Sequence, residues 1–222
     1  MTHEDSRQGD RSREQSATDP SQTGFSPTLD WEETFQRNVW DYLGEVGETP
    51  RYAVVAGYIH KLLPRGRILD VGCGEGVLLD YLDPERIDYS GFDISPTAVT
   101  RARRINVDAK ITVGSMDDFK PAENETYEII VFNESLQSVR QPIETLRRFF
   151  GFLTPSGHII ISLFHNRNPE SVGALCTRSF KAEIQAGRVN VIAASEVLNC
   201  ESGLKWTIYC LGRPRTIETF DG

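Results

Sequence analysis

The nine residues ILDVGCGEG at positions 68–76 decide the expected fold. Apolar residues over 67–71 predict a buried strand, and glycine then recurs at every second position from Gly72. Glycines in such a loop let the backbone approach a ligand closely and adopt positive φ angles. A short helix is expected over 77–82, and its N-terminus points toward the same ligand. The stretch therefore predicts a strand, a ligand-binding loop and a helix in succession.

Short apolar runs alternate with helical patterns along the rest of the chain. This alternation predicts a parallel sheet covered by helices on both faces. Two final runs at 189–198 and 204–211 are separated by about five residues, which predicts an antiparallel hairpin at the sheet edge. The expected fold class is α/β, a Rossmann-like doubly wound sheet that is mostly parallel with a C-terminal antiparallel hairpin. Further strands are expected at 87–93, 110–113, 127–132 and 158–164, and helices from Ser95 and over 142–153.

The chain before the sheet divides into a polar tail and two helices. Residues 1–27 carry almost no apolar side chains, so a disordered N-terminal tail is expected there. Residues 28–222 are expected to form one domain, in which the helices of 28–64 cover the site. The first helix begins at Asp30, and Thr49 begins the second as its N-cap. The apolar stripe of the first helix is Phe35, Val39, Leu43 and Val46.

The composition excludes several classes of protein. With 24 Lys and Arg against 32 Asp and Glu, the net charge of -8 argues against a groove that binds nucleic acid. No apolar run approaches the ~20 residues of a membrane span, and no secretory signal stands at the N-terminus, so a cytoplasmic protein is expected. The four cysteines match no zinc-site spacing, and no metal is expected. Reduced thiols are expected, although Cys200 and Cys210 lie on neighbouring predicted strands that a disulfide could join.

Acidic residues around the glycine loop favour one cofactor over another. Asp93 ends the next strand, 23 residues beyond Asp70, where a carboxylate accepts hydrogen bonds from both hydroxyls of a ribose. A dinucleotide-binding loop reads G-x-G-x-x-G, whereas this loop reads G-x-G-x-G with Asp70 two residues before it. A carboxylate repels a pyrophosphate and attracts an ammonium group. S-adenosyl-L-methionine, which has an ammonium group and no phosphate, is therefore favoured over NAD(P).

Five segments resemble the motifs of class I S-adenosylmethionine-dependent methyltransferases of the small-molecule type. LDVGCGEG and GFDIS resemble the first two motifs, and VGSMDDF is similar to the adenine-binding segment. YEIIVFNESLQSV resembles the fourth motif, and FLTPSGHIIIS resembles the run before the fifth strand. The resemblance implies the seven-stranded class I methyltransferase fold. Arg51-Tyr52, NES and SLFH together are similar to small bacterial enzymes that act on sugars and natural products, such as the nodulation N-methyltransferases.

The resemblance implies which residues hold the methionine end of the cofactor. Gly72 and Gly74 give close backbone approach, and Asp70 lies near the ammonium group. Asn133 offers its backbone carbonyl near the amino-acid end. Because helices before the sheet cover the cofactor in this fold, Arg51 could pair with the cofactor carboxylate, or it could be a surface arginine.

The resemblance also implies a set of residues at the adenosine end. Asp93 takes the ribose hydroxyls, and Ile94 packs on the adenine. The Met116 amide bonds a ring nitrogen, and Asp117 accepts a hydrogen bond from the adenine amino group. Family members often have aspartate at the position of Ser115, so the chain departs from the family pattern there.

Two residues are candidates for the catalytic step. Ligands of an open parallel sheet bind at the carboxyl ends of its strands, where Glu134 follows the fourth strand and His165 the fifth. Imidazole titrates near ~6.5, which suits proton removal at neutral pH, so His165 is the expected general base. Glu134 is expected to orient it or to bind the acceptor. The alternatives are a His165 that caps the strand end, a Glu134 that bonds nearby backbone or substrate without proton transfer, and catalysis by alignment alone.

The expected function is methyl transfer from S-adenosyl-L-methionine to an oxygen or nitrogen of a small-molecule acceptor. Residues 168–187, with Leu175 and Phe180, are expected to form the other wall of the acceptor pocket, and Trp40, Tyr42 and Tyr52 could face the site. No nucleic-acid or membrane partner is expected. Two alternatives stay open: a non-catalytic S-adenosylmethionine-binding or scaffold protein, and an NAD(P)-dependent oxidoreductase.

Overall fold

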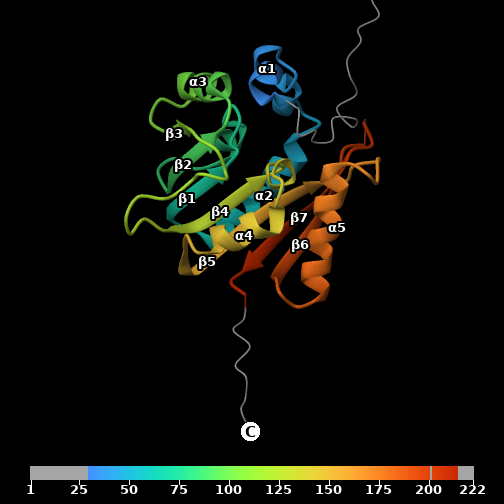
Figure 1. Cartoon of the computed structure of the whole chain (residues 1–222). Helices are drawn as coiled ribbons and strands as arrows, with labels where there is room; N and C mark the ends of the chain where they lie inside the picture. Colours follow the sequence, from blue (N-terminus) through green and yellow to red (C-terminus); the bar gives the residue numbers. More distant parts are fainter. Residues whose placement is uncertain (1–29, 201, 215–222) are drawn as a thin grey trace, which may run out of the picture.

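The computed structural model describes residues 30–200 and 202–214 and has the expected α/β architecture (Figure 1). One seven-stranded sheet has the order β3-β2-β1-β4-β5-β7-β6. Strands β1 to β5 are parallel, and β7 is antiparallel to both of its neighbours. The tail expected over 1–27 lies outside the described residues. The strands are β1 Gly66–Val71, β2 Ile87–Asp93, β3 Lys110–Val113, β4 Tyr127–Asn133, β5 Leu153–Phe164, β6 Asn190–Leu198 and β7 Lys205–Gly212.

Helices cover both faces of the sheet, with α4 and α5 on one face and α2 on the other (Figure 1). In β4, Ile129 and Val131 join the core beneath α2 and α3, whereas Ile130 and Phe132 join the core beneath α4 and α5. Burial on both faces explains why this strand is continuously apolar. The helical elements are α1 Trp31–Gln36, η2 Asp41–Gly44, α2 Thr49–Leu62, η3 Val77–Tyr81, α3 Pro96–Ile105, η4 Leu136–Ser138, α4 Pro142–Phe150 and α5 Val172–Gln185.

The last two strands form the expected antiparallel hairpin, and β7 lies between β5 and the edge strand β6. Seven of the eight residues of β7 are buried, whereas most of β6 is not. The pairing sets Trp206 beside Phe164 at the carboxyl end of β5. The hairpin therefore brings a residue from late in the chain to the edge of the sheet where ligands are expected.

The N-terminal segment forms two short helices, and the expectation of one longer helix before α2 is wrong. Asp30 caps α1 as expected, because its side chain accepts a 3.1 Å hydrogen bond from the Glu33 amide. The helix ends at Gln36, and Asn38 then has a φ of 58°. Asparagine is one of the few residues that adopts this left-handed conformation, which interrupts a helix. Val46, expected on the apolar stripe, is exposed.

Smaller differences occur where the expected elements begin and end. Glu48 rather than Thr49 is the N-cap of α2, and its carboxylate binds Arg51 instead of a backbone amide. The segment after the glycine loop is a 3-10 helix, η3. Leu153, expected at the end of α4, begins β5. The helical spacing of Ile105 from Ala98 and Ala102 predicts that it faces inward from α3, but it is 70% exposed.

We expect Phe149→Ala to lower the free energy of unfolding by about 3–5 kcal/mol. Phe149 is fully buried, and its ring lies 5.8 Å from that of Phe119, 5.1 Å from that of Phe132 and 5.2 Å from that of Phe152, between centroids. Ile105→Ala is the control, with an expected change within about 0.5 kcal/mol because the side chain is exposed. Urea denaturation measures both variants, and equal losses would contradict the burial pattern.

Candidate active site

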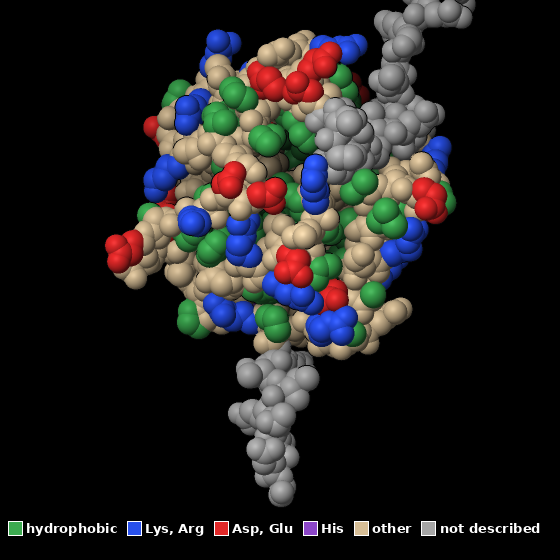
Figure 2. Space-filling view, viewed as in Figure 1, with side chains coloured by type: hydrophobic (Ala, Val, Ile, Leu, Met, Phe, Trp, Pro, Cys, Tyr) green, Lys and Arg blue, Asp and Glu red, His purple; other side chains and the backbone are tan. Residues whose placement is uncertain are grey.

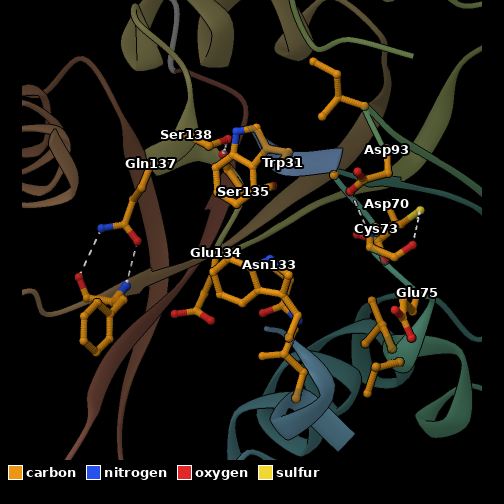
Figure 3. Close-up of a pocket in the computed structure, with 18 of the residues that line it drawn as sticks. Trp31, Asp70, Cys73, Glu75, Asp93, Asn133, Glu134, Ser135, Gln137 and Ser138 are labelled. Carbon is orange, nitrogen blue, oxygen red and sulfur yellow. Dashed lines mark hydrogen bonds between the residues drawn. The ribbon is translucent and has the colours of Figure 1, made fainter. Parts of the chain in front are cut away.

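A cavity of about 520 Å³ opens at the carboxyl ends of the parallel strands. Figure 3 shows Asp70 and Asp93 on one side of it, Glu134 and Gln137 on the other, and Trp31 between them. Loops that follow five strands form its floor, and the N-terminal helices cover it. Glu134 lies on its wall, together with all nine residues expected to bind the cofactor: Arg51, Asp70, Gly72, Gly74, Asp93, Ile94, Met116, Asp117 and Asn133.

The glycine loop has the backbone that its composition predicts. Gly72 and Gly74 have φ angles of 71° and 54°, which are strained for other residues. A Cβ on Gly72 would lie 2.7 Å from the Cβ of Ser135, so the loop packs directly on the segment after β4. A Cβ on Gly74 would meet only the ring of Phe35, at 3.6 Å. The first glycine is therefore required by packing, and the second opens the loop toward the cavity.

Asp70 is a buried carboxyl group with one unused oxygen. Its Oδ2 accepts a 2.9 Å hydrogen bond from the Tyr89 hydroxyl, and its Oδ1 has no partner among the described residues. Burial raises the pKa of Asp70 to about 7, and the Tyr89 hydrogen bond opposes this shift. A buried carboxyl oxygen without a partner, on the wall of a cavity, is a binding position for a donor or a cation.

Asp93 is fixed by two backbone amides. Its Oδ1 accepts from the Ser95 amide and its Oδ2 from the Gly74 amide, both at 2.9 Å. Each oxygen keeps a further lone pair for a ligand. Burial raises the pKa of Asp93, and these backbone hydrogen bonds oppose the shift. The neighbouring Ile94 is 54% exposed and offers the cavity an apolar surface.

The segment after β3 is held by an arginine from α4. Arg148 donates to the backbone carbonyls of Met116 and Asp117. The hydroxyl oxygen of Ser115 accepts a 3.1 Å hydrogen bond from the Asp117 amide. The segment thus presents Met116 and Asp117 to the cavity while its carbonyl groups bond to the arginine.

Arg51 is 1% exposed and bonds to the protein itself. Its guanidinium donates to Glu48 Oε2 at 2.9 and 3.2 Å and to Asn133 Oδ1 at 2.6 Å, and it lies 3.4 Å from Glu134 Oε2. The ring of Tyr52 lies 4.3 Å from the guanidinium carbon. The alternative of a surface arginine is therefore wrong, because α2 turns this side chain into the molecule.

Glu134 combines an uncommon backbone conformation with a fixed side chain. Its φ of 63° lies in the left-handed region, which few residues other than glycine adopt. Its Oε1 accepts a hydrogen bond from Trp206 Nε1, and its Oε2 faces Arg51. The side chain is nevertheless 25% exposed and lies on the cavity wall. Such outliers concentrate at functional sites.

The structure does not bring His165 into the cavity, which contradicts the hypothesis of a histidine base. Successive strand residues point to opposite faces, so Phe164 and Trp206 line the cavity while His165 lies on the other face. There its Nε2 lies 2.6 Å from Thr207 Oγ1. Burial lowers the pKa of His165, and neighbouring lysines act in the same direction. The alternative of a histidine at a strand end fits this position.

Helix α1 covers the cavity and is attached to the start of α3. Trp31 lines the cavity, and the next residue, Glu32, reaches the other helix. The Glu32 carboxylate accepts 2.5 Å hydrogen bonds from the Ser95 and Thr97 hydroxyls and a 3.1 Å hydrogen bond from the Thr97 amide. These hydrogen bonds lower the pKa of Glu32 to about 2. The cover is thereby coupled to the segment just after β2.

Residues 168–187 do not form the expected second wall. Of this stretch, which the structure describes throughout, Gly173 alone lies on the cavity wall. Phe180 is buried against Tyr209, and Leu175 is 45% exposed. Helix α5 therefore packs on the sheet, and the N-terminal helices supply the aromatic wall instead. Trp40, Tyr42 and Tyr52 line the cavity as expected.

Gln137 is a structural residue of the site that the sequence did not single out. Its Nε2 donates to the carbonyls of Phe164 and Gly173 at 3.1 Å each, and its Oε1 accepts from the Phe164 amide at 2.9 Å. The side chain thus joins η4, β5 and α5 at the cavity edge. Its partners in β5 and α5 lie 27 and 36 residues away, so no local pattern of the sequence marks it.

Within residues 30–200 and 202–214, no group of three or more His, Cys, Asp and Glu is arranged to hold a metal ion. None of the helices found there is long and apolar enough to cross a membrane. All four cysteines are unpaired. Figure 2 shows acidic and basic side chains interspersed over one face of the molecule.

Comparison with known proteins assigns the chain to a family. Residues 48–199 match the family model described as a methyltransferase domain, and the chain therefore belongs to this methyltransferase-domain family. The ubiquinone biosynthesis O-methyltransferase of Vibrio campbellii is 33% identical over 109 residues, which are 47% of this chain and 46% of that protein. The chain spans about half the length of the curated relatives it matches.

Solved structures share the fold. The N-methyltransferase NodS from Bradyrhizobium japonicum WM9, in complex with S-adenosyl-L-homocysteine, has a TM-score of 0.63 at 17% identity, covering 83% of this chain and 98% of that one. The 1,6-didemethyltoxoflavin-N1-methyltransferase of Burkholderia thailandensis, with 1,6-didemethyltoxoflavin and S-adenosylhomocysteine bound, has a TM-score of 0.63 at 15% identity, covering 82% of this chain and 85% of that one. The expected class I methyltransferase fold is confirmed.

We expect the stability of the wild type, relative to Asp70→Asn, to fall as the pH rises from about 4 to about 7. The pKa of Asp70, about 7, lies above that of an unfolded aspartate, so the folded state binds the proton more tightly and loses this contribution as the carboxyl ionises. The difference is at most about 4 kcal/mol. Urea denaturation across this pH range measures it, with exposed Asp118→Asn as the control. Parallel curves for the wild type and Asp70→Asn would contradict the assignment.

Proposed function

We propose that the protein binds S-adenosyl-L-methionine in the cavity and transfers its methyl group to an oxygen or nitrogen of a small-molecule acceptor. The observation that carries this proposal is Asp70 Oδ1, a buried acceptor without a partner, on a cavity wall where it suits an ammonium group. Membership of the methyltransferase-domain family supports the proposal, as does the S-adenosylhomocysteine bound in the solved relatives.

The methionine end of the cofactor fits the loops after β1 and β4. Asp70 bonds the ammonium group, and the backbone at Gly72 and Gly74 approaches the chain of the amino acid. The side chain of Asn133 already accepts hydrogen bonds from Arg51 and a serine of β5, so its backbone carbonyl makes the contact. The guanidinium of Arg51 already pairs with the carboxylates of Glu48 and Glu134. We therefore propose that Arg51 holds Glu134 in place and does not bind the cofactor.

The adenosine end fits the loops after β2 and β3. Asp93 accepts hydrogen bonds from the ribose hydroxyls with the lone pairs that its two backbone contacts leave free. Ile94 packs on the adenine, and the Met116 amide bonds a ring nitrogen. Asp117 accepts a hydrogen bond from the adenine amino group.

The protein's part in the chemistry is alignment and the handling of a proton. The bound cofactor supplies a methyl group on a positively charged sulfur, which needs no further activation. Glu134 contacts the acceptor and takes up its proton, while Trp206 and Arg51 hold the carboxylate in place. Trp40 and Tyr42 cover the cavity and exclude water.

The alternatives fit the cavity less well. An NAD(P) cofactor would bring its pyrophosphate to the glycine loop beside Asp70, a buried carboxyl group. A non-catalytic binding protein would not need the strained Glu134 at the cavity wall. We also propose a cytoplasmic location, because unpaired thiols are typical of a reducing compartment.

We expect Asp93→Ala to weaken binding of S-adenosylhomocysteine at least about tenfold, because it removes hydrogen bonds to a charged acceptor. Gly74→Val is expected to weaken it as well, because its φ of 54° is strained for valine. Calorimetry measures affinity, NADH is titrated in parallel, and Asp118→Ala is the surface control. Wild-type affinity within about twofold in both site variants, or tighter binding of NADH, would overturn the cofactor assignment.

We expect Glu32→Ala to speed the dissociation of S-adenosylhomocysteine several-fold. The substitution removes the hydrogen bonds that attach α1 to Ser95 and Thr97, so the cover opens more readily. Stopped-flow tryptophan fluorescence follows release, since Trp31 lies on the cavity wall. Glu33→Ala, on the same helix but not bonded to α3, is the matched control, and equal rates for the two variants would show that the attachment does not limit release.

A further inference from the structure

The cavity wall carries more acidic side chains than basic ones. Most of the acidic groups lie on the side of the proposed cofactor, where Glu75 is paired with Arg101 at 2.7 Å. Such a wall repels an anionic acceptor and attracts a cationic one. The charged side chains of the wall are six acidic residues, Asp41, Asp70, Glu75, Asp93, Asp117 and Glu134, and two arginines, Arg51 and Arg140.

Acidic groups also outnumber basic ones around Glu134, which lies on the side of the cavity away from the proposed cofactor. Arg51 is the cation beside Glu134, but it also pairs with Glu48, which is 3% exposed. Two carboxylates thus share one buried guanidinium, so Glu134 does not have this cation to itself. The same charges act on Tyr42: burial raises the pKa of its hydroxyl, and Glu134 and Glu48 act in the same direction.

Glu134 has free capacity for a ligand. Its two oxygens accept one hydrogen bond from Trp206 Nε1 and one contact from Arg51, whereas a carboxylate has about four acceptor positions. The side chain is the least buried member of the Glu48–Arg51–Glu134 network, at 25% exposed. The open positions therefore face the cavity, where an N–H donor can reach them.

Aromatic rings surround this carboxylate. Phe164 and Trp206 lie 6.1 Å apart between ring centroids on one side, and Trp40 and Tyr42 lie 6.1 Å apart at the N-terminal cover. All four line the cavity. Ring faces attract cations, and a carboxylate set among aromatic rings is a common way of binding an organic ammonium group.

We infer that the methyl acceptor is an organic amine whose nitrogen binds at Glu134 among these aromatic rings. The inference rests on the proposed methyl transfer and specifies its acceptor as nitrogen rather than oxygen. We assign Arg51 and Glu48 as positioning residues, because Arg51 holds the Glu134 carboxylate and Glu48 in turn holds Arg51.

The proton balance of the step follows from this arrangement. The bound ammonium group passes one proton to Glu134, from which it leaves to solvent, and the amine becomes neutral. Its lone pair then forms the new N–C bond while the C–S bond of the methyl donor breaks and its electron pair stays on sulfur. The product is a methylammonium ion and a neutral thioether.

Three probes that share one ring and differ in charge test the inference: benzylamine, benzyl alcohol and benzoate. Each is titrated into the full-length protein saturated with S-adenosylhomocysteine. The three tryptophans of the chain, Trp31, Trp40 and Trp206, all line the cavity, so intrinsic fluorescence reports its occupancy, and calorimetry confirms the affinity. We expect benzylamine to bind at least about tenfold more tightly than the other two.

Glu134→Gln is expected to abolish this preference, because glutamine keeps the shape and an acceptor for Trp206 but loses the charge. Glu144→Gln removes the same charge from the exposed surface of α4 and is expected to keep the preference. Equal affinities in the wild type, no binding by any probe, or a preference that survives in Glu134→Gln would each overturn the inference. Binding of S-adenosylhomocysteine, measured first and alone, tests the proposed function separately.

Discussion

The burial of the Arg51 guanidinium is the constraint on which the site depends. At 1% exposed, this charge persists only if acceptors and counter-charges surround it. Glu48 supplies one carboxylate from the same end of α2, and Asn133 and Glu134 supply acceptors from the end of β4. These contacts hold α2 against the carboxyl edge of the sheet. They also fix the orientation of Asn133, the last residue of β4, and of Glu134, which follows it.

This network divides the cavity into two halves with different electrostatics. In the half formed by the loops after β1 and β2, Asp70 and Asp93 are buried, and burial raises the pKa of both carboxyl groups. In the other half, Glu134 is partly exposed and is held by a cation and an indole N–H. The first half suits a ligand that brings its own positive charge and hydroxyl groups. The second half suits the part of the acceptor that gives up a proton.

The sequence predicts the sheet well because each of its strands carries a local signal. The glycine loop, the alternation of strands with helices and the final hairpin all appear where expected. The sequence predicts the N-terminal cover less well. Phe35 and the apolar residues after it keep helical spacing across Asn38, and this spacing predicts one continuous helix. The left-handed backbone of Asn38 interrupts it. Arg51 also bonds to Asn133 and Glu134, which lie 82 residues or more along the chain, and periodicity does not encode such distant contacts.

His165 and Glu134 each follow a strand of the sheet, and this position alone does not show which of the two side chains faces the cavity. Both follow a strand whose apolar residues are buried on both faces, so the pattern does not tell which face the next side chain takes. Pairing with β7 decides it: Phe164 lies opposite Trp206 on the cavity side, and the following residue, His165, must point away. At the end of β4 the chain turns through the positive φ of Glu134, which directs that side chain to Trp206 and Arg51. The β7 hairpin thus excludes the histidine from the cavity and, through the same tryptophan, holds the carboxylate within it.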